Sequence, residues 1–458
     1  AAIAAPAAVA APAVVAKPAA PAAVAAPAAP AAVAAPAAPA AVAAPAASPA
    51  LVAYAAKVAG KPGAIYAGDL KQMVGPATTK DQGDLDGNVT LETLQRHLYV
   101  YESDFYKSLL EKAKLTNPTP LVSTGQSISI QHACINRTLL PCKATDSFFF
   151  PNVLARTKGQ VKFVTSSYPE LGIGGPDTLK LVEDGTLAMS DIYSGFVSGQ
   201  LPAIEIQNLW GVYPTQASYY FAAAAVTPDI EKLVEAAAGG AKVINHNWYS
   251  GNDQFFLTKK PLRTVADFKG LKTRSHGTAL SDWIEGMGAT AQFVAFAEVY
   301  SALERGILGA GVTGGDAAFG QRLYEVADYI NGPLISWPDT NNVINSKVWA
   351  KIPPDLQAII IEEGAKSELE ALRIGAAQNE AGLQRNINAG MEYVEFSPEL
   401  KARSEATAIE RVMPSWIKRI GGPDAPFAKI YNEKVASLVG LKINSDGSLT
   451  KIPVVQGK

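Results

Sequence analysis

Hydrophobic and polar positions alternate most regularly between residues 260 and 315, where they predict strands and helices in turn. Strands are expected at residues 271–275 and 291–295 and leading into 311–315, and helices at 278–286 and 297–306. Short strands that alternate with helices are typical of βαβ units and a parallel sheet. Ligands bind beyond the carboxyl ends of such strands, and Arg274 lies at such an end.

The rest of the C-terminal two thirds of the chain continues this α/β pattern. Strands are expected at residues 128–133 and 161–165, a helix at 146–157, and a strand that enters a helix at 343–349. Residues 353–387 form one long helical pattern, which begins with prolines in its first turn. Helices are expected from there to residue 441, before a polar, turn-rich end at 442–458.

Residues 1–49 follow a different rule, because every third position from Ile3 to Ser48 is almost always Pro or Val and nearly all others are Ala. A polyproline II helix has three residues per turn, so it would gather these side chains on one edge. Proline at this density excludes an α-helix. The tail is either a semi-stiff linker or, through residues 3–48, a ridge that docks on another protein or on copies of itself.

Residues 50–125 are expected to form a small helical extension, with one amphipathic helix over residues 91–115. The Asp- and Gly-rich stretch 81–90 resembles a calcium loop of the EF-hand kind. However, Gln82 and Thr93 occupy the first and twelfth places, where Asp and Glu are needed. Both a calcium loop and a plain turn therefore remain open.

Composition narrows the classes of function. The chain has 458 residues, is 48% hydrophobic and carries a net charge of −2, with no long run of either sign. A large core in two or more domains is expected, and nothing in the charge pattern favours nucleic acid or an anionic membrane as a partner. Outside the tail, no apolar stretch is long enough to span a membrane. The lack of a start methionine and of a signal pattern suggests a processed, mature form.

Cysteine and histidine give little support for metal or catalytic chemistry. Cys134 and Cys142 are either a disulfide or two thiols that never meet, and no set of four zinc ligands accompanies them. The histidines are scattered, although His132 and His276 are both expected near the ligand-binding edge. No serine-hydrolase, zinc-protease or Walker motif is present. Gly172, Gly174 and Gly175 do not complete a dinucleotide-binding motif, so we expect neither enzyme activity nor a cofactor or metal.

Several short motifs resemble those of the extracytoplasmic solute receptors of TRAP transporters, the DctP-like family. They are Lys260-Pro261, DFKGLKTR at residues 267–274, GAT at 288–290, EVYSALERG at 298–306, YEVADY at 324–329 and YPELG at 168–172. The match of many positions at the family's spacing makes the resemblance specific.

The resemblance implies an α/β, two-lobed periplasmic-binding-protein-like fold in which the long helix spans both lobes. Lobe I would comprise residues 126–250, completed by C-terminal helices, and lobe II residues 251–345. The spanning helix and the C-terminal helices would occupy 346–441, followed by a tail at 442–458. The protein would then be periplasmic or otherwise extracytoplasmic.

The resemblance assigns to Arg274 the carboxylate of the ligand, which a planar guanidinium binds by two charge-assisted hydrogen bonds. The alternative is a structural ion pair with an Asp or Glu. The family often has Asn where Thr313 stands, so the ligand chemistry of its sialic-acid and dicarboxylate receptors does not transfer directly. Further candidates for the pocket are Tyr168, Trp337, Gln131, Phe255 and Trp248.

The expected function is that of a receptor which binds a small organic anion in the cleft between the lobes, closes on it and delivers it to TRAP membrane permease subunits. The alternative is a structural or accessory subunit of a larger complex, which reuses the receptor fold and assembles through its N-terminal tail. A binding receptor needs an open, arginine-centred cleft, whereas an assembly subunit does not.

Overall fold

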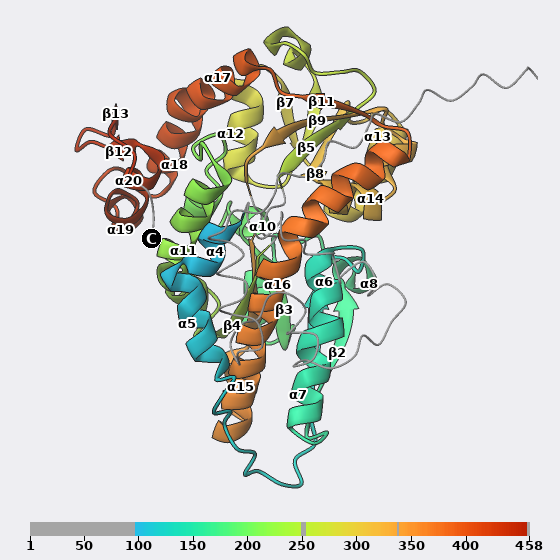
Figure 1. Cartoon of the computed structure of the whole chain (residues 1–458), viewed down its shortest axis with the longest axis vertical. Helices are drawn as coiled ribbons and strands as arrows, with labels where there is room; N and C mark the ends of the chain where they lie inside the picture. Colours follow the sequence, from blue (N-terminus) through green and yellow to red (C-terminus); the bar gives the residue numbers. More distant parts are fainter. Residues whose placement is uncertain (1–96, 249–252, 337–338, 456–458) are drawn as a thin grey trace, which may run out of the picture. The chain divides into compact units, whose positions relative to one another are not determined.

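The computed structural model describes residues 97–248, 253–336 and 339–455 (Figure 1). The predictions for the polyproline tail, for the docking ridge at residues 3–48 and for the calcium-like stretch at 81–90 therefore lie outside the described residues.

A first sheet of five strands has the order β2-β1-β3-β10-β4. The strands are β1 (Ile128–Cys134), β2 (Val161–Ser167), β3 (Met189–Tyr193), β4 (Lys242–Trp248) and β10 (Asp339–Ile344). β1 is parallel to β2 and β3, whereas β10 is antiparallel to both β3 and β4. The carboxyl ends of β1, β2, β3 and β4 therefore lie at one edge of this sheet.

A second sheet of six strands has the order β11-β9-β5-β8-β6-β7. Its strands are β5 (Gln254–Thr258), β6 (Lys272–Ser275), β7 (Thr290–Phe293), β8 (Ala310–Gly314), β9 (Tyr329–Leu334) and β11 (Glu392–Glu395). β6 is parallel to β7 and β8, as expected, but β5 is antiparallel to β8 and β9. The parallel pairing predicted for residues 260–315 is thus confirmed, and the sheet as a whole is mixed because β5 follows a strand of the first sheet rather than a helical crossover within its own.

The long helix α16 (Pro354–Asn388) confirms the prediction for residues 353–387. It packs against β4, α5 (Asp104–Ala113) and α7 (Phe150–Arg156) near the first sheet and against α14 (Gly315–Gly320) near the second (Figure 1). Gly382 makes the second contact close, since a Cβ there would lie 2.2 Å from the backbone nitrogen of Asp316. A single helix therefore contacts elements at both sheets.

The helix predicted at residues 146–157 begins earlier than expected. A continuous helical run comprises α6 (Leu140–Ala144), a π-turn at Thr145–Phe149 and α7 (Phe150–Arg156). Pro141 lies in its first turn, where a missing N–H costs nothing. Cys142 therefore lies in a helix and not in the loop where the sequence pattern placed it.

The single helix predicted at residues 91–115 is wrong within the described part of the chain. There, α4 (Leu98–Glu102) and α5 (Asp104–Ala113) are separated at Ser103, whose backbone is extended with ψ 151°. The Ser103 side chain accepts a hydrogen bond from the backbone N–H of Tyr106. Serine stabilises a helix N-terminus in this way. A second helix therefore starts after Ser103, although the apolar periodicity by itself would continue one helix through this point.

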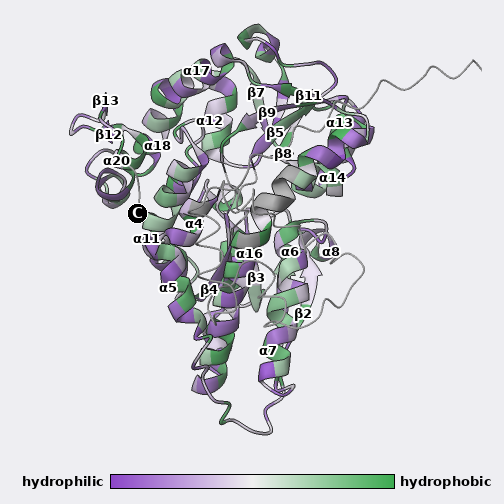
Figure 2. Ribbon diagram, in the orientation of Figure 1, coloured by the Kyte–Doolittle hydropathy of each residue, from purple (hydrophilic) through white to green (hydrophobic). Residues whose placement is uncertain are grey.

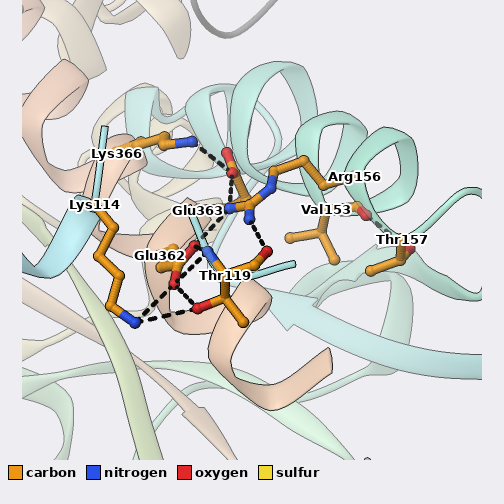
Figure 3. A network of polar contacts seen from close by, with 8 residues as sticks. All are labelled: Lys114, Thr119, Val153, Arg156, Thr157, Glu362, Glu363 and Lys366. Atoms are coloured by element: carbon orange, nitrogen blue, oxygen red, sulfur yellow. Dashed lines mark hydrogen bonds and ion pairs between the residues drawn. The ribbon is translucent and has the colours of Figure 1, made fainter. Parts of the chain in front are cut away.

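The segment after α5 is bound to α16 by buried charges (Figure 3). Glu362 of α16 accepts hydrogen bonds from the backbone N–H and the hydroxyl of Thr119, and it forms ion pairs with Arg156 at 2.8 Å and Lys114 at 3.2 Å. Burial raises the pKa of Glu362, but these donors outweigh it and lower the pKa overall. Lys114 and Thr119, in the described part of residues 50–125, are thus attached to the long helix.

The remaining helices cover the sheets and include α8 (Tyr168–Leu171), α9 (Thr178–Asp184), α10 (Ser194–Val197), α11 (Gln216–Ala237), α12 (Thr278–Gly286) and α13 (Val299–Glu304). The C-terminal part adds α17 (Pro398–Thr407), α18 (Met413–Arg419), α19 (Pro426–Ile430) and α20 (Ala436–Val439), and a hairpin of β12 (Leu441–Ile443) and β13 (Leu449–Lys451).

Figure 2 shows both hydrophilic and hydrophobic positions on outer helices such as α5, α7 and α17. The largest buried cluster contains Trp210, Trp283 and Trp416. Among the described residues, every helix is too short or too polar to cross a membrane.

Candidate functional site

A small cavity lies where the carboxyl ends of β6 and β8 meet that of β3 from the first sheet. It has a volume of about 50 Å³. Its lining residues are Ile135, Leu139, Leu140, Tyr193, Phe196, Gln254, Arg274, His276, Phe296, Thr313, Gly314, Asp316 and Ala317. Both sheets therefore contribute to one cavity, at the strand ends where α/β proteins bind ligands.

Arg274 is the cation of this cavity and is only 3% exposed. Its Nε donates to the carbonyl of Val294 at 3.1 Å and one terminal nitrogen donates to the carbonyl of Val312 at 2.6 Å. The guanidinium lies 5.7 Å from the centre of the Phe296 ring, which contributes a cation–π contact. These contacts hold the side chain at the end of β6 without neutralising it.

Burial lowers the pKa of Arg274 to about 10, so the side chain is still charged at neutral pH. Among the described residues, no Asp or Glu forms an ion pair with it. The structural ion pair considered as an alternative is therefore not formed there. A buried charge without a counter-charge is costly, and an anionic ligand in the cavity would supply the missing partner.

His276 and Tyr193 join the two sheets across the cavity. The Tyr193 hydroxyl lies 2.8 Å from Nδ1 of His276. Burial and the nearby charge of Arg274 lower the pKa of His276 well below its ordinary value, so its ring is neutral. Burial raises the pKa of Tyr193, whose hydroxyl keeps its proton and can donate to Nδ1. The other ring nitrogen of His276 then carries the proton and is a hydrogen-bond donor.

The cavity has one acidic wall and one apolar wall. Asp316 of α14 is the carboxylate of the lining, and it is ion-paired with Arg385 of α16 at 2.8 Å. Ile135, Leu139 and Leu140 form an apolar wall from the first sheet and its helix. The lining thus combines one cation, one carboxylate and mostly apolar surface.

The structure brings together two of the residues predicted for the site, Arg274 and Thr313. Tyr168 is buried beside the cavity, where its hydroxyl donates to the carbonyl of Asp191, but it does not line the space. Gln131 is exposed on β1. Trp337 and the side chain of Trp248 lie outside the described residues.

Phe255 is packed in the core of the second sheet, 6.3 Å from the ring of Tyr393, and its neighbour Gln254 lines the cavity instead. Successive residues of a strand point to opposite faces, so Gln254 faces this cavity and Phe255 faces the core. His276, which was expected near the site, does line it, whereas His132 is bonded to Asp191 within the first sheet.

Tyr193, Phe196, Asp316 and the apolar wall also line the cavity, but the sequence did not predict them as site residues. A usable signal existed for Tyr193, because it ends a buried strand of the first sheet, where the strand-end rule places ligands. The apolar wall carried no comparable signal, since a loop rich in leucine and isoleucine looks like ordinary core. Within the described ranges, no group of three or more His, Cys, Asp and Glu side chains is placed to hold a metal ion.

Two mixed sheets, a long helix that packs against both of their layers and an arginine-centred cavity between them define a solute receptor of the periplasmic-binding-protein class. The family model described as bacterial extracellular solute-binding protein, family 7 (DctP), matches residues 142–418. Because this match covers the larger part of the chain, the protein belongs to the DctP family of TRAP solute receptors. Its members bind substrates and are not enzymes.

The individual relatives are distant in sequence and similar in fold. A monocarboxylate 2-oxoacid-binding periplasmic protein of Nostoc is 23% identical over 61% of this chain and 76% of its own length. The C4-dicarboxylate-binding periplasmic protein of Rhodobacter capsulatus is 29% identical over 35% of this chain and 49% of its own length. A TRAP solute-binding protein of Desulfovibrio salexigens with bound orotic acid superimposes with a TM-score of 0.62 at 20% identity, over 68% of this chain and all of its own.

Proposed function

We propose that this protein is the extracytoplasmic receptor of a TRAP-type transporter and that it binds a small organic carboxylate through Arg274. The observation that carries the proposal is the buried guanidinium at the end of β6, which has no carboxylate partner among the described residues. A carboxylate supplies both the missing charge and two acceptors in the plane of the guanidinium. Thr313 and the proton-bearing nitrogen of His276 are further donors for the same ligand.

The lining favours an acid with a single carboxylate and a compact, largely apolar body. Only Arg274 offers a cation in the cavity lining, and a second ligand carboxylate would approach Asp316, which repels it. Six of the lining side chains are apolar or aromatic hydrocarbons, which suits a short carbon skeleton better than a sugar acid with many hydroxyl groups: Ile135, Leu139, Leu140, Phe196, Phe296 and Ala317. The 2-oxoacid named for the Nostoc relative is of this kind.

Ligand entry requires the two sheets to separate beside the cavity. The backbone N–H of Thr278 donates to the hydroxyl of Ser198 at 3.0 Å, and a Cβ on Gly195 would lie 2.5 Å from the carbonyl oxygen of His276. These contacts join the first-sheet segment after β3 to the second-sheet segment after β6. When the two sheets close through these contacts, they would shield the ligand from water. The closed form is the state that a membrane permease would recognise.

Replacement of Arg274 by lysine tests the proposal, because lysine keeps the charge and loses the planar pair of donors. We expect ligand affinity to fall ten-fold or more, which corresponds to about 1.4 kcal/mol. Isothermal titration calorimetry of the full chain measures this change. The matched control is Arg305→Lys at the exposed end of α13, which should bind as the wild type does. Equal affinity in the Arg274→Lys and Arg305→Lys variants would remove Arg274 from the site.

A further inference from the structure

Cys134 and Cys142 form a disulfide, which decides between the two alternatives left open by the sequence. Their Cα atoms are 5.6 Å apart, within the range of ordinary disulfides. Both residues are buried. Cys134 is the last residue of β1, and Cys142 lies in the first turn of α6. The bond thus joins a central strand of the first sheet directly to the helix that follows it.

The segment enclosed by this disulfide is the apolar wall of the cavity. Ile135, Leu139 and Leu140 all lie between the two cysteines, and all three line the cavity. No other described segment of the first sheet and its helices contributes as many lining residues. The position of this wall is therefore fixed at both of its ends by one covalent bond.

The other interactions of the segment are local or exposed. Arg137 forms an ion pair with Glu170 at 2.7 Å and donates a hydrogen bond to the carbonyl of Thr165 in β2 at 2.8 Å, but the side chains of Arg137 and Glu170 are about half exposed. Exposed ion pairs contribute little to a conformation. The side chain of Asn136 accepts hydrogen bonds from the N–H and the hydroxyl of Thr138, which shapes the turn without attaching it to the sheet. The disulfide is thus a covalent cross-link that holds the wall against β1, in addition to the apolar packing of Ile135 and Leu139.

The same segment reaches the second sheet. A Cβ on Gly320 of α14 would lie 3.1 Å from the carbonyl oxygen of Thr138. The loop therefore rests against the helix that carries Asp316 and Ala317 on the opposite side of the cavity. A displacement of the loop would change both the apolar wall and this contact between the two halves of the site.

We propose that the Cys134–Cys142 disulfide is a positioning element for ligand binding, which holds the loop at residues 135–141 as a preformed apolar wall and thereby selects for the carbon skeleton of the ligand. The proposal rests on the function proposed above, since it assumes that the cavity binds a carboxylic acid. Preformed walls improve affinity because the ligand does not have to order them on binding. The effect should grow with the apolar part of the ligand, which contacts the wall, and should be small for an acid that reaches only Arg274.

The experiment uses the full chain with Cys134→Ala and Cys142→Ala together, since alanine avoids a buried hydroxyl without a partner. Calorimetry would compare acetate, a two-carbon acid, with straight-chain acids of increasing length, well below the melting temperature of each variant. We expect the double variant to bind the longest acid that the wild type accepts about ten-fold more weakly, and to bind acetate within two-fold of the wild type. Val234→Ala, in the buried face of α11 and outside the cavity lining, is the control for a general loss of stability and should show no dependence on ligand length.

Equal losses for short and long acids, or no loss for either, would overturn the proposal. If the double variant does not fold, the wild type treated with a phosphine reductant, with both thiols confirmed by alkylation and mass spectrometry, gives the same comparison. If the protein binds acids through Arg274 and loss of the disulfide leaves the affinities unchanged, only the inference about the disulfide is contradicted. A wild type that binds none of the acids contradicts the proposed function as well.

Discussion

Arg274 is a buried cation whose counter-charge would come from the proposed ligand. Burial lowers its pKa to about 10, and its contacts with the carbonyls of Val294 and Val312 and with the Phe296 ring supply no full negative charge. A bound carboxylate would supply that charge among mostly apolar side chains, where charge-assisted hydrogen bonds are stronger than in water. Ligand binding should accordingly stabilise the fold by about 2.7 kcal/mol at a hundred times Kd.

Thr313 is expected to contribute one hydrogen bond to the ligand from the end of β8. Thr313→Val keeps the shape and the β-branching but removes the hydroxyl, so affinity should fall about three- to ten-fold, in line with about 0.5–1.5 kcal/mol for one neutral hydrogen bond. Thr313→Ser keeps the hydroxyl and should stay within two-fold of the wild type. Calorimetry with the same acid measures both variants, and a serine variant as weak as the valine variant would assign Thr313 a packing role instead.

His246 makes the stability of the fold depend on pH, independently of the ligand. It is buried between Asp339, at 3.3 Å, and Glu231, at 3.2 Å. Burial alone would lower its pKa, but hydrogen bonds to these carboxylates and the charge of Glu368 raise it to about 10. The folded state therefore binds a proton more tightly than the unfolded state, whose histidine titrates near 6.5.

The stabilisation from His246 should be fully present below about pH 6.5 and should be lost as the pH rises toward 10. Urea unfolding of the wild type between pH 6 and pH 10 should show a falling free energy of unfolding. His246→Gln, which cannot gain the proton, should show a flatter profile over this range, whatever its absolute stability. Parallel profiles for the two proteins would mean that His246 is not charged in the folded state.

At the scale of helices and strands, the bounds were predicted correctly where hydrophobic periodicity alone determines them. The helix at Thr278–Gly286 was predicted to the residue, and the long helix to within one residue, because neither contains a competing cap or turn signal. The break at Ser103 was not predicted, since the apolar spacing continues through it and only the capping hydrogen bond to Tyr106 ends the pattern. The parallel pairing of β6 with β7 and β8 was predicted, but the antiparallel pairing of β5 and β10 was not, because it arises from the chain's passage between the two sheets.

The contact between α14 and α16 positions the part of the cavity lining that α14 contributes. Gly382→Ala gains about 1 kcal/mol of helix propensity, but its Cβ would lie 2.2 Å from the backbone nitrogen of Asp316, which cannot move without α14. We expect a net loss of about 2 kcal/mol in the free energy of unfolding and weaker ligand binding, because α14 carries Asp316 and Ala317 of the cavity.

Chemical denaturation and calorimetry measure these two effects of Gly382→Ala. Gly199→Ala is the matched control, since no atom lies within 4 Å of a Cβ at that exposed position. It should leave both stability and affinity unchanged. A Gly382→Ala variant as stable as the wild type would mean that the two helices can separate without cost.

At the scale of the whole molecule, the family motifs predicted the fold and pointed to two of the residues that line the cavity, Arg274 and Thr313. Arg274 and Thr313 were found because they lie in matched strands of the second sheet, whose carboxyl ends were evident from the sequence. The wall at Ile135, Leu139 and Leu140 was not found, because it reaches the cavity only when a second sheet is placed opposite the first. A cavity between two sheets is a tertiary property, and no local pattern in either sheet contains it.

The arrangement of the described residues makes the cavity the meeting point of the protein's main parts. The first sheet contributes Tyr193 and the disulfide-bonded loop, and the second sheet contributes Arg274 and Thr313. The long helix α16 contacts the cavity wall through the Arg385–Asp316 ion pair. Ligand binding should therefore be felt across the fold and should appear as a rise in melting temperature.

The central claim is that one carboxylate binds to Arg274, and a thermal-shift measurement with paired acids and amides tests it most directly. The full chain would be heated with short monocarboxylic acids and 2-oxoacids, with the neutral amide of each, and with dicarboxylic and sugar acids. We predict that at least one monocarboxylic acid raises the melting temperature in a saturable way, while its amide has no effect and the dicarboxylic and sugar acids have less. An amide as effective as its acid, or a protein that no carboxylic acid stabilises, would contradict the account.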